Sequence, residues 1–298
     1  MSTDSLSSLG GRLSDKQLSR YLNFLGQIRR NSKAMLGLSI VLGLILIAIF
    51  APLVAPYDPE AISGANKVQS PTLQHPFGTD NFGRDIFSRV LYGARISIYV
   101  GLMTVGISIS AGVPLGLVAG YYGGLVDEVV MRIMDAMMSF PPILLALVIM
   151  AALGPNLTNV LLALGFVYTP YLARVTRSST LETVNKEYVQ AAEARGEGDL
   201  FILFKEVMPN TLAPVIVQAS ISFAFAILAE AALSFLGMGT QPPTPSWGLM
   251  INSGRGFMQT APWMLLFPAI AIGLTVVGFN MLGDGLRDVL DPKVEAIE

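Results

Sequence analysis

Long apolar runs separated by short polar stretches make up most of the chain after residue 33. The first run, residues 34–54, carries no charged side chain. Because about 20 apolar residues in a helix cross the roughly 30 Å hydrocarbon core of a bilayer, this run is long enough to span it. Five later runs are also mostly apolar, at residues 96–121, 129–153, 160–173, 212–236 and 263–282. The pattern predicts an all-α, polytopic membrane protein with six transmembrane helices.

The composition agrees with this pattern. Hydrophobic residues make up 52% of the 298 residues and charged residues 13%, whereas roughly 25% charge is usual in a soluble domain. The net charge of -2 provides no basic field for nucleic acid, so we expect no nucleic-acid partner. The chain has no cysteine and a single histidine, His75, which excludes disulfides, thiolate nucleophiles and a histidine-rich metal centre. We therefore expect membrane lipid around the chain and no metal site in it.

Basic residues gather in three places: ahead of residue 34, between Arg174 and Lys205, and at Arg287 and Lys293. By the positive-inside rule these parts face the cytoplasm, and both termini lie there. The polar start of the chain has no short apolar core, so we expect no cleavable signal peptide. The chain then divides into a cytoplasmic N-terminal tail at residues 1–33, the first span at 34–54, an external segment at 55–95, a core of five further spans at 96–286 and a cytoplasmic C-terminal tail at 287–298.

Glycines and prolines indicate how the spans pack and bend. Small residues let helices approach closely in lipid, and the second span carries five glycines at spacings of four to six: Gly101, Gly106, Gly112, Gly116 and Gly120. We predict that this helix packs in the interior of the bundle. In the third span, Pro141 and Pro142 remove two backbone donors and break or kink the helix.

Two carboxylates fall inside predicted spans. Asp135 lies one helical turn from Arg132, and the two charges can neutralise each other near the membrane edge. Glu230 lies among alanines in the fifth span, where a lone carboxylate is costly unless it faces a water-filled path or has a polar partner. Asp135 and Glu230 are therefore candidates for a translocation path or gate, and a buried hydrogen bond between helices is the alternative for Glu230.

One long charged segment, residues 176–209, interrupts the hydrophobic second half. Such a segment must lie in water, so it presents a face that soluble partners can contact. Residues 181–195 contain good helix formers without proline or glycine, and Gly196 and Gly198 then end the helix and turn the chain. A second amphipathic piece follows and is closed by Pro209. We predict an exposed helix, a glycine turn and a second helix that leads back into the bilayer, with an ordinary solvated loop helix as the alternative.

The external segment ends in a charged run at residues 75–97. Its residues of both signs allow a local ion-pair network made of Asp80, Arg84, Asp85, Arg89 and Arg95. Gly78 and Gly83 permit tight turns within the run. A structural plug is the favoured interpretation, and a docking surface for an external protein is the alternative.

The sequence contains no motif for ATP hydrolysis or for two common hydrolase chemistries. A phosphate-binding loop needs Gly directly before Lys, and none of the lysines follows a glycine. A metalloprotease helix needs two histidines, and the Gly-x-Ser-x-Gly motif of serine hydrolases does not occur. We expect that the chain is not an enzyme and that its energy comes from another polypeptide.

The charged segment resembles a known family signature. Gln190, Ala191 and Ala192, then Gly196, then Met208 and Pro209 keep the spacing of the Glu-Ala-Ala motif of membrane subunits of binding-protein-dependent ABC importers. Gln190, Glu206 and Met208 depart from its consensus. The resemblance implies a coupling helix at about 181–196 that docks on a cytoplasmic ATPase. It assigns this ATPase coupling to Glu187, Gln190, Ala191, Ala192, Glu193, Arg195, Gly196 and Pro209.

Two further blocks, around residues 78–97 and 241–247, resemble the dipeptide, oligopeptide and nickel branch of these importers. The resemblance implies a type I ABC importer permease fold in the bacterial cytoplasmic (inner) membrane. It implies as partners a second homologous permease subunit, two ATPase subunits and an external solute-binding protein, which Asp80, Arg84 and Asp85 are expected to contact. ATP and Mg are expected on the ATPase subunits, with no cofactor in this chain.

The resemblance favours short peptides as the solute, with nickel chelates, haem or glutathione as alternatives. A hypothesis of a different class is a self-sufficient secondary carrier or channel that uses Asp135 and Glu230 as an ion relay. The charged segment discriminates between the two, because a carrier without a motor has no need of a coupling surface.

Overall fold

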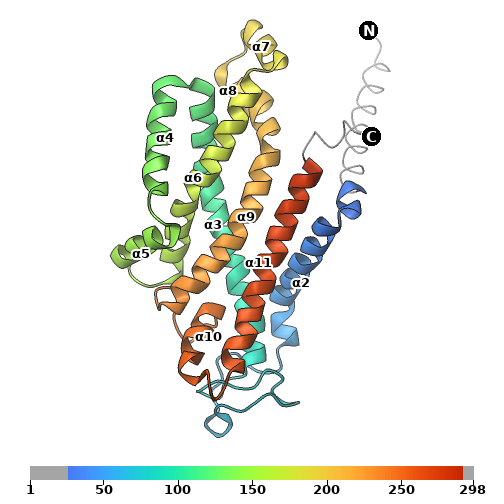
Figure 1. The fold of residues 1–298 in the computed structure, drawn as a ribbon, viewed down its shortest axis with the longest axis vertical. Coiled ribbons are helices and arrows are strands. Elements are labelled where there is room, and N and C mark those ends of the chain that lie inside the picture. The colour runs from blue at the N-terminus through green and yellow to red at the C-terminus, as the bar shows by residue number, and fades with distance from the viewer. Residues whose placement is uncertain (1–25, 291–298) are drawn as a thin grey trace.

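The computed structural model describes residues 26–290. These residues form an elongated bundle whose long helices run side by side (Figure 1). Within this range there is no β-strand, and a bridge between Thr79 and Asp85 is isolated. The all-α prediction is confirmed for the described part of the chain. The predicted tails fall mainly at residues 1–25 and 291–298, which lie outside it.

The main helices are, in chain order, α2 (Ser32–Val54), α3 (Ile86–Tyr122), α4 (Gly124–Met138), α5 (Pro142–Leu153), α6 (Leu157–Val184), α7 (Glu187–Ala194), α8 (Asp199–Phe201), α9 (Met208–Phe235), α10 (Trp247–Gly254) and α11 (Trp263–Leu290). A π-helix, Ile202–Val207, joins α8 to α9. Helix α7 lies at one end of the bundle, which we call the inner end (Figure 1). The segment between α2 and α3 and helix α10 lie at the opposite, outer end.

The spans agree with the predicted membrane architecture. Helices α2, α3 and α11 and the continuous run Asp199–Phe235 are each long and apolar enough to cross a membrane. Helices α4 and α5 meet the same criterion as a pair, with a bend of 89° between them. Helix α6 has 28 residues but carries polar side chains along its second half. Among the described residues four helices, or five spans with the bent pair, therefore meet this criterion, and α6, which occupies the place of the predicted fourth span, does not.

Three helices extend beyond their predicted bounds. Helix α3 begins at Ile86 rather than residue 96, because the Asp85 carboxylate accepts the Ser88 N–H at 2.7 Å and caps it. Helix α6 continues to Val184 rather than residue 173, and α11 continues to Leu290 rather than residue 282. The added turns of α6 and α11 carry charged and polar side chains, whereas the added turns of α3 also include buried apolar residues such as Ile86 and Leu91.

The break predicted at Pro141 and Pro142 is confirmed. Helix α4 closes when the Ser139 N–H bonds the Asp135 carbonyl oxygen at 3.0 Å. Helix α5 starts at Pro142. The N–H of a first helical residue has no acceptor within the helix, so a proline there costs no hydrogen bond. As a result α5 turns across the bundle instead of continuing along it (Figure 1).

Helix α3 packs on α6 through a row of glycines that we call the α3–α6 seam, formed by Gly112, Gly116 and Gly120. A Cβ atom at Gly112 would lie 2.7 Å from the Thr169 carbonyl oxygen, and one at Gly120 would lie 2.7 Å from the Thr180 Cβ. Neither distance leaves room for a side chain. The predicted interior packing of this helix is confirmed along the seam.

Other residues of α3 extend this contact. The Ser108 hydroxyl donates to the Gly165 carbonyl oxygen of α6 at 2.9 Å. The Phe223 ring of α9 covers Gly101. Gly106 differs, because a Cβ atom there would have no neighbour within 4 Å. The glycine pattern therefore predicts packing at four of its five positions.

We expect Gly116→Val to destabilise the bundle and Gly106→Val, on the same helix, to leave its stability nearly unchanged. The added side chain at Gly116 meets the Ala173 backbone, which cannot rotate away. Overpacking of this kind costs roughly 1–3 kcal/mol. The loss of folded protein on heating in detergent measures the difference, and equal melting temperatures of the two variants would contradict the seam.

Candidate functional site

The predicted helix 181–195 consists of two helices, so that prediction is wrong in its continuity. Helix α6 ends at Val184, and α7 starts afresh at Glu187. The Asn185 side-chain amide donates to the Leu181 carbonyl oxygen at 2.7 Å and closes the last turn of α6. Lys186 is extended, with ψ of 144°, and redirects the chain. Helix α7 is therefore a separate unit at the tip of the bundle.

Helix α7 has a buried face and a solvent face. Val189 and Ala192 are 0% exposed and pack against Ile202, Leu203 and Val207 of the π-helix. The expected coupling residues Glu187, Gln190, Ala191, Glu193 and Arg195 are exposed. Ala192 differs from the other expected coupling residues because it points into the protein.

Gly196 ends α7 as predicted. Its φ is +79°, a left-handed conformation that favours glycine. The Gly196 N–H bonds the Glu193 carbonyl oxygen at 2.9 Å, and the Glu197 N–H reaches back to the Ala192 carbonyl oxygen at 3.2 Å. This pair of bonds forms a Schellman turn, which fixes the direction in which the chain leaves α7.

Pro209 does not close the second helix, contrary to the prediction. The helical run is continuous from Asp199 to Phe235. Pro209 has no N–H, and its ring clashes with a carbonyl four residues earlier in a regular α-helix. The preceding turn is wider: the Met208 N–H bonds the Leu203 carbonyl oxygen, five residues back. The Asn210 side chain then donates to the Glu206 carbonyl oxygen at 2.7 Å, so the π-helix accommodates the proline without a break.

Charged contacts tie neighbouring elements together at the inner end. Asp135 pairs with Arg174 of α6 rather than with Arg132, whose guanidinium instead contacts Glu128 at 2.7 Å. The predicted pair of Arg132 with Asp135 is therefore wrong, because side chains on α6 reach Asp135 from across the interface.

Three more contacts involve the same end. Arg177 of α6 binds both carboxylate oxygens of Asp127 on α4. The hydroxyls of Tyr121 and Tyr122 donate to the two oxygens of Asp199, at 3.4 and 3.1 Å. Helix α8 is thereby attached to the end of α3.

One tyrosine on α7 has a perturbed pKa. Burial raises the pKa of the Tyr188 hydroxyl, and the nearby Glu206 carboxylate raises it further. The hydroxyl therefore remains neutral at physiological pH.

Glu230 is fully buried and anchors the outer loop. Its carboxylate accepts the Ser234 hydroxyl at 2.6 Å and the Thr240 hydroxyl at 3.3 Å. The Thr240 N–H in turn donates to the Ser234 oxygen at 3.0 Å. Ser234 is on the same helix as Glu230, and Thr240 is in the loop that follows, so these bonds do not join two helices. A role of Glu230 in a translocation path or gate stays a prediction.

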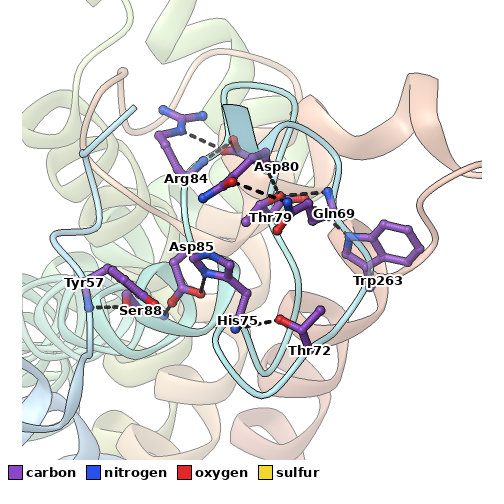
Figure 2. Close-up of polar contacts among 11 residues, drawn as sticks. Tyr57, Gln69, Thr72, His75, Thr79, Asp80, Arg84, Asp85, Ser88 and Trp263 are labelled. Carbon is purple, nitrogen blue, oxygen red and sulfur yellow. Dashed lines mark hydrogen bonds and ion pairs between the residues drawn. The ribbon is translucent and has the colours of Figure 1, made fainter. Parts of the chain in front are cut away.

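The charged run of the external segment forms a compact buried cluster (Figure 2). The Asp80 carboxylate accepts a hydrogen bond from the Arg84 guanidinium at 2.7 Å. The Arg89 guanidinium lies 3.9 Å from the same carboxylate. Asp85 contacts His75 at 2.9 Å as well as capping α3. The predicted network is thus confirmed for Asp80, Arg84 and Arg89.

The burial of these side chains bears on their expected role. Asp80, Arg84 and Asp85 are 5%, 8% and 2% exposed. Asp80 and Arg84 face each other, and Asp85 faces His75 and the Ser88 N–H, so these contacts hold the shape of the segment. Contact with an external protein stays a prediction for them. Arg95 is outside the network and lies 5.8 Å from the centre of the Tyr92 ring.

Sequence reasoning missed the role of the two tryptophans. The Trp247 indole is 1% exposed and donates to the Val90 carbonyl oxygen at 3.0 Å, so it packs inside the protein. The Trp263 indole donates to the Thr79 carbonyl oxygen at 3.3 Å (Figure 2). Their spacing in the chain gives no sign of these partners, because the contacts join segments far apart in sequence.

Comparisons with known proteins identify the family that shares this architecture. A family described as the binding-protein-dependent transport system inner membrane component matches residues 112–296, and the N-terminal TM domain of oligopeptide transport permease C matches residues 20–76. The chain is similar to the dipeptide transport system permease protein DppC of Alkalihalophilus pseudofirmus, with 48% identity over 91% of this chain and 89% of the relative. It is also similar to the glutathione transport system permease protein GsiD of Escherichia coli, with 44% identity over 91% and 90%.

A solved structure has the same fold. It is an inward-facing conformation of the MetNI methionine ABC transporter, with a TM-score of 0.56 and 18% identity over 67% of this chain and 96% of that chain. The fold, the apolar spans and the two family matches agree. The chain therefore belongs to the family of inner membrane components of binding-protein-dependent transport systems, and it is a multi-pass permease subunit of an ABC importer.

Proposed function

We propose that this chain is one of two permease subunits of an ATP-driven importer of short peptides, and that α7 is its coupling helix. The relatives named as dipeptide and di/tripeptide permeases support the solute class. In this proposal an external binding protein delivers the peptide and the two permease subunits form the path. Two cytoplasmic ATPase subunits supply the work and hold ATP and Mg. The cytoplasmic placement of both termini and of α7 belongs to the same proposal.

The attachment of α7 to the spans carries the proposal. The cluster around its buried face includes Leu117 of α3, Leu172 of α6 and Val215 of α9. Because protein interiors are closely packed, a force on the exposed face of α7 is passed to the inner ends of all three helices. A docked ATPase that moves α7 therefore moves the wall of the bundle with it.

Glutathione is the second candidate solute. It is a tripeptide, and a glutathione permease is among the relatives. Uptake of labelled dipeptide and of labelled glutathione by cells with and without this chain decides between the two.

A self-sufficient carrier has less support. Asp135 is paired with Arg174, and Glu230 is enclosed by hydroxyl groups. A relay would need both carboxylates to face a common water path. If the purified chain alone accumulates peptide in vesicles without an ATPase, the proposed motor-driven function is wrong.

We expect Ala191→Arg to abolish coupling without loss of the protein. Ala191 is exposed on α7, so the change leaves the buried face intact, whereas a substitution at Ala192 would disturb the packing. An unpaired charge in a docked interface costs several kcal/mol, so peptide uptake should fall at least about tenfold. Uptake and the ATP hydrolysis stimulated by the binding protein are the measurements.

The matched control is Glu128→Ala at the exposed inner end of α4. It removes one exposed ion pair with Arg132, and such pairs contribute little. We expect normal uptake from this variant. Normal uptake by the Ala191→Arg variant, at equal membrane levels, would show that α7 is not the coupling surface.

We expect Pro209→Ala to weaken coupling through the π-helix. With an N–H restored at residue 209, the π-helix can rewind as a regular α-helix. Because an α-helix turns by about 100° per residue, this rewinding rotates α7 relative to α9. Coupling energies between sites are typically about 1–3 kcal/mol, so stimulation of ATP hydrolysis should drop roughly fivefold or more. Pro114→Ala in α3, an exposed proline away from the π-helix, is the control and should retain full stimulation. Equal stimulation in both variants would remove Pro209 from the coupling unit.

A further inference from the structure

Two neighbouring cavities lie along α6 and α9. A cavity of about 340 Å³ lies between α5, α6 and α9. A second cavity of about 560 Å³ lies at the inner ends of α6, α9 and α11. Gln218 and Ile221 line both cavities and join them. We call the combined space the α6–α9 groove.

The part of the groove nearer the outer end is neutral. None of the residues that line it is charged, and its polar groups are the side chains of Tyr168, Tyr171, Gln218 and Ser222. The Gln218 amide donates to the Ser222 hydroxyl at 3.3 Å. Most of this wall is apolar, with few hydroxyl and amide groups that can exchange hydrogen bonds with a peptide backbone, and it carries no charge that would select among charged side chains.

The inner mouth carries charges of both signs. Glu182, Lys186 and Arg287 line it together with Ser179 and Asn210. Among the described residues these three charges form no ion pair, although other charges at the same end are paired across helices. An unpaired carboxylate beside unpaired cations complements a molecule that carries one ammonium and one carboxylate.

The lining of the groove ends near the outer loop. Its last lining residue on α9 is Ala232, next to the turn that Glu230 and Ser234 attach to the outer loop. At Ala231, whose carbonyl oxygen packs against Gly248, α10 covers the other face of α9. The charged residues of the groove lie at its opposite, inner end.

We propose that the α6–α9 groove is one wall of the solute path, and that Glu182 and Arg287 at its inner mouth bind the charged termini of a short zwitterionic peptide as it leaves. This inference rests on the proposed function and names the residues that meet the solute. The 560 Å³ of the mouth lies within the range of about 300–1,000 Å³ that is typical of small-ligand sites. Both charges are exposed, so binding is weak, as release requires.

The absence of cysteine from the chain permits a direct test. Ser179→Cys at the mouth and Ala232→Cys at the outer end of the groove are each introduced into the full chain, expressed with its native partners in inverted membrane vesicles. A charged, water-soluble thiol reagent then labels cysteines that water reaches. Ala194→Cys on the exposed face of α7 and Ile216→Cys on the exposed face of α9 are the controls.

We expect both groove cysteines to be labelled. Ile216→Cys should stay unlabelled, because its exposed side chain is on a predicted span and outside the groove, where lipid is expected to cover it. We expect dialanine to bind with a Kd of about 1 mM. At ten times this concentration it should slow the labelling of both groove cysteines about tenfold. N-acetyl-dialanine amide, which has no charged terminus, should slow it much less at Ser179→Cys. Labelling of Ala194→Cys should not respond to either peptide.

The charge variants Glu182→Gln and Arg287→Gln should each remove the preference for the charged peptide at Ser179→Cys. Lys33→Gln, an exposed cation outside the groove, should retain it. Groove cysteines that stay unlabelled would show that lipid or another subunit fills the groove, and equal protection by both peptides would show that the mouth does not recognise termini. Either result overturns the inference.

The same vesicles separate this inference from the proposed function. Loss of coupling in the Ala191→Arg variant together with no peptide protection would defeat the groove assignment alone. Peptide protection together with normal coupling in that variant would instead defeat the role of α7.

Discussion

The close contact between α3 and α6 is the interaction on which the other features of the bundle depend. Lipid tails are as apolar as leucine, so burying apolar side chains does not by itself bring two spans together. The glycines of the seam remove the side chains between the two backbones, and van der Waals contact then holds them. Because α3 and α6 are fixed in this way, α4 can be attached to α6 by Asp127 and Asp135, and α7 can rest on the inner ends of both.

A second constraint is that backbone and side-chain polar groups inside a membrane need partners within the protein. The chain meets it differently at each interruption. At Pro142 a new helix starts, so no donor is missing. At Pro209 the helix widens into a π turn, and an asparagine side chain supplies a donor. At Glu230 two hydroxyl groups donate to one carboxylate oxygen, Oε1, whereas the buried Oε2 has no hydrogen-bond partner among the described residues. As a result, the chain changes direction at Pro142, the helix widens before Pro209, and Glu230 attaches α9 to the outer loop.

The two ends of the bundle are held by different chemistry. The outer end is fastened by buried contacts, with Asp80 on Arg84 and Trp247 on the Val90 carbonyl, which are costly to break. The inner end is held by ion pairs that are partly or largely exposed and by a small apolar cluster under α7. Exposed pairs contribute little and exchange readily with water. Rearrangement is therefore easier at the inner end, where α7 and the charged mouth of the groove lie.

The sequence by itself determined the helical membrane class, the break at Pro141 and Pro142, the glycine packing of α3 and the turn at Gly196, because each follows from local period or backbone chemistry. Only the tertiary structure decided that Asp135 pairs with Arg174, that Glu230 is sealed inside and that Ala192 faces inward. Partner choice depends on which helices meet, and spacing along one helix does not contain that information. For the same reason the groove along α6 and α9 has no signature in the chain: its walls are brought together only by packing.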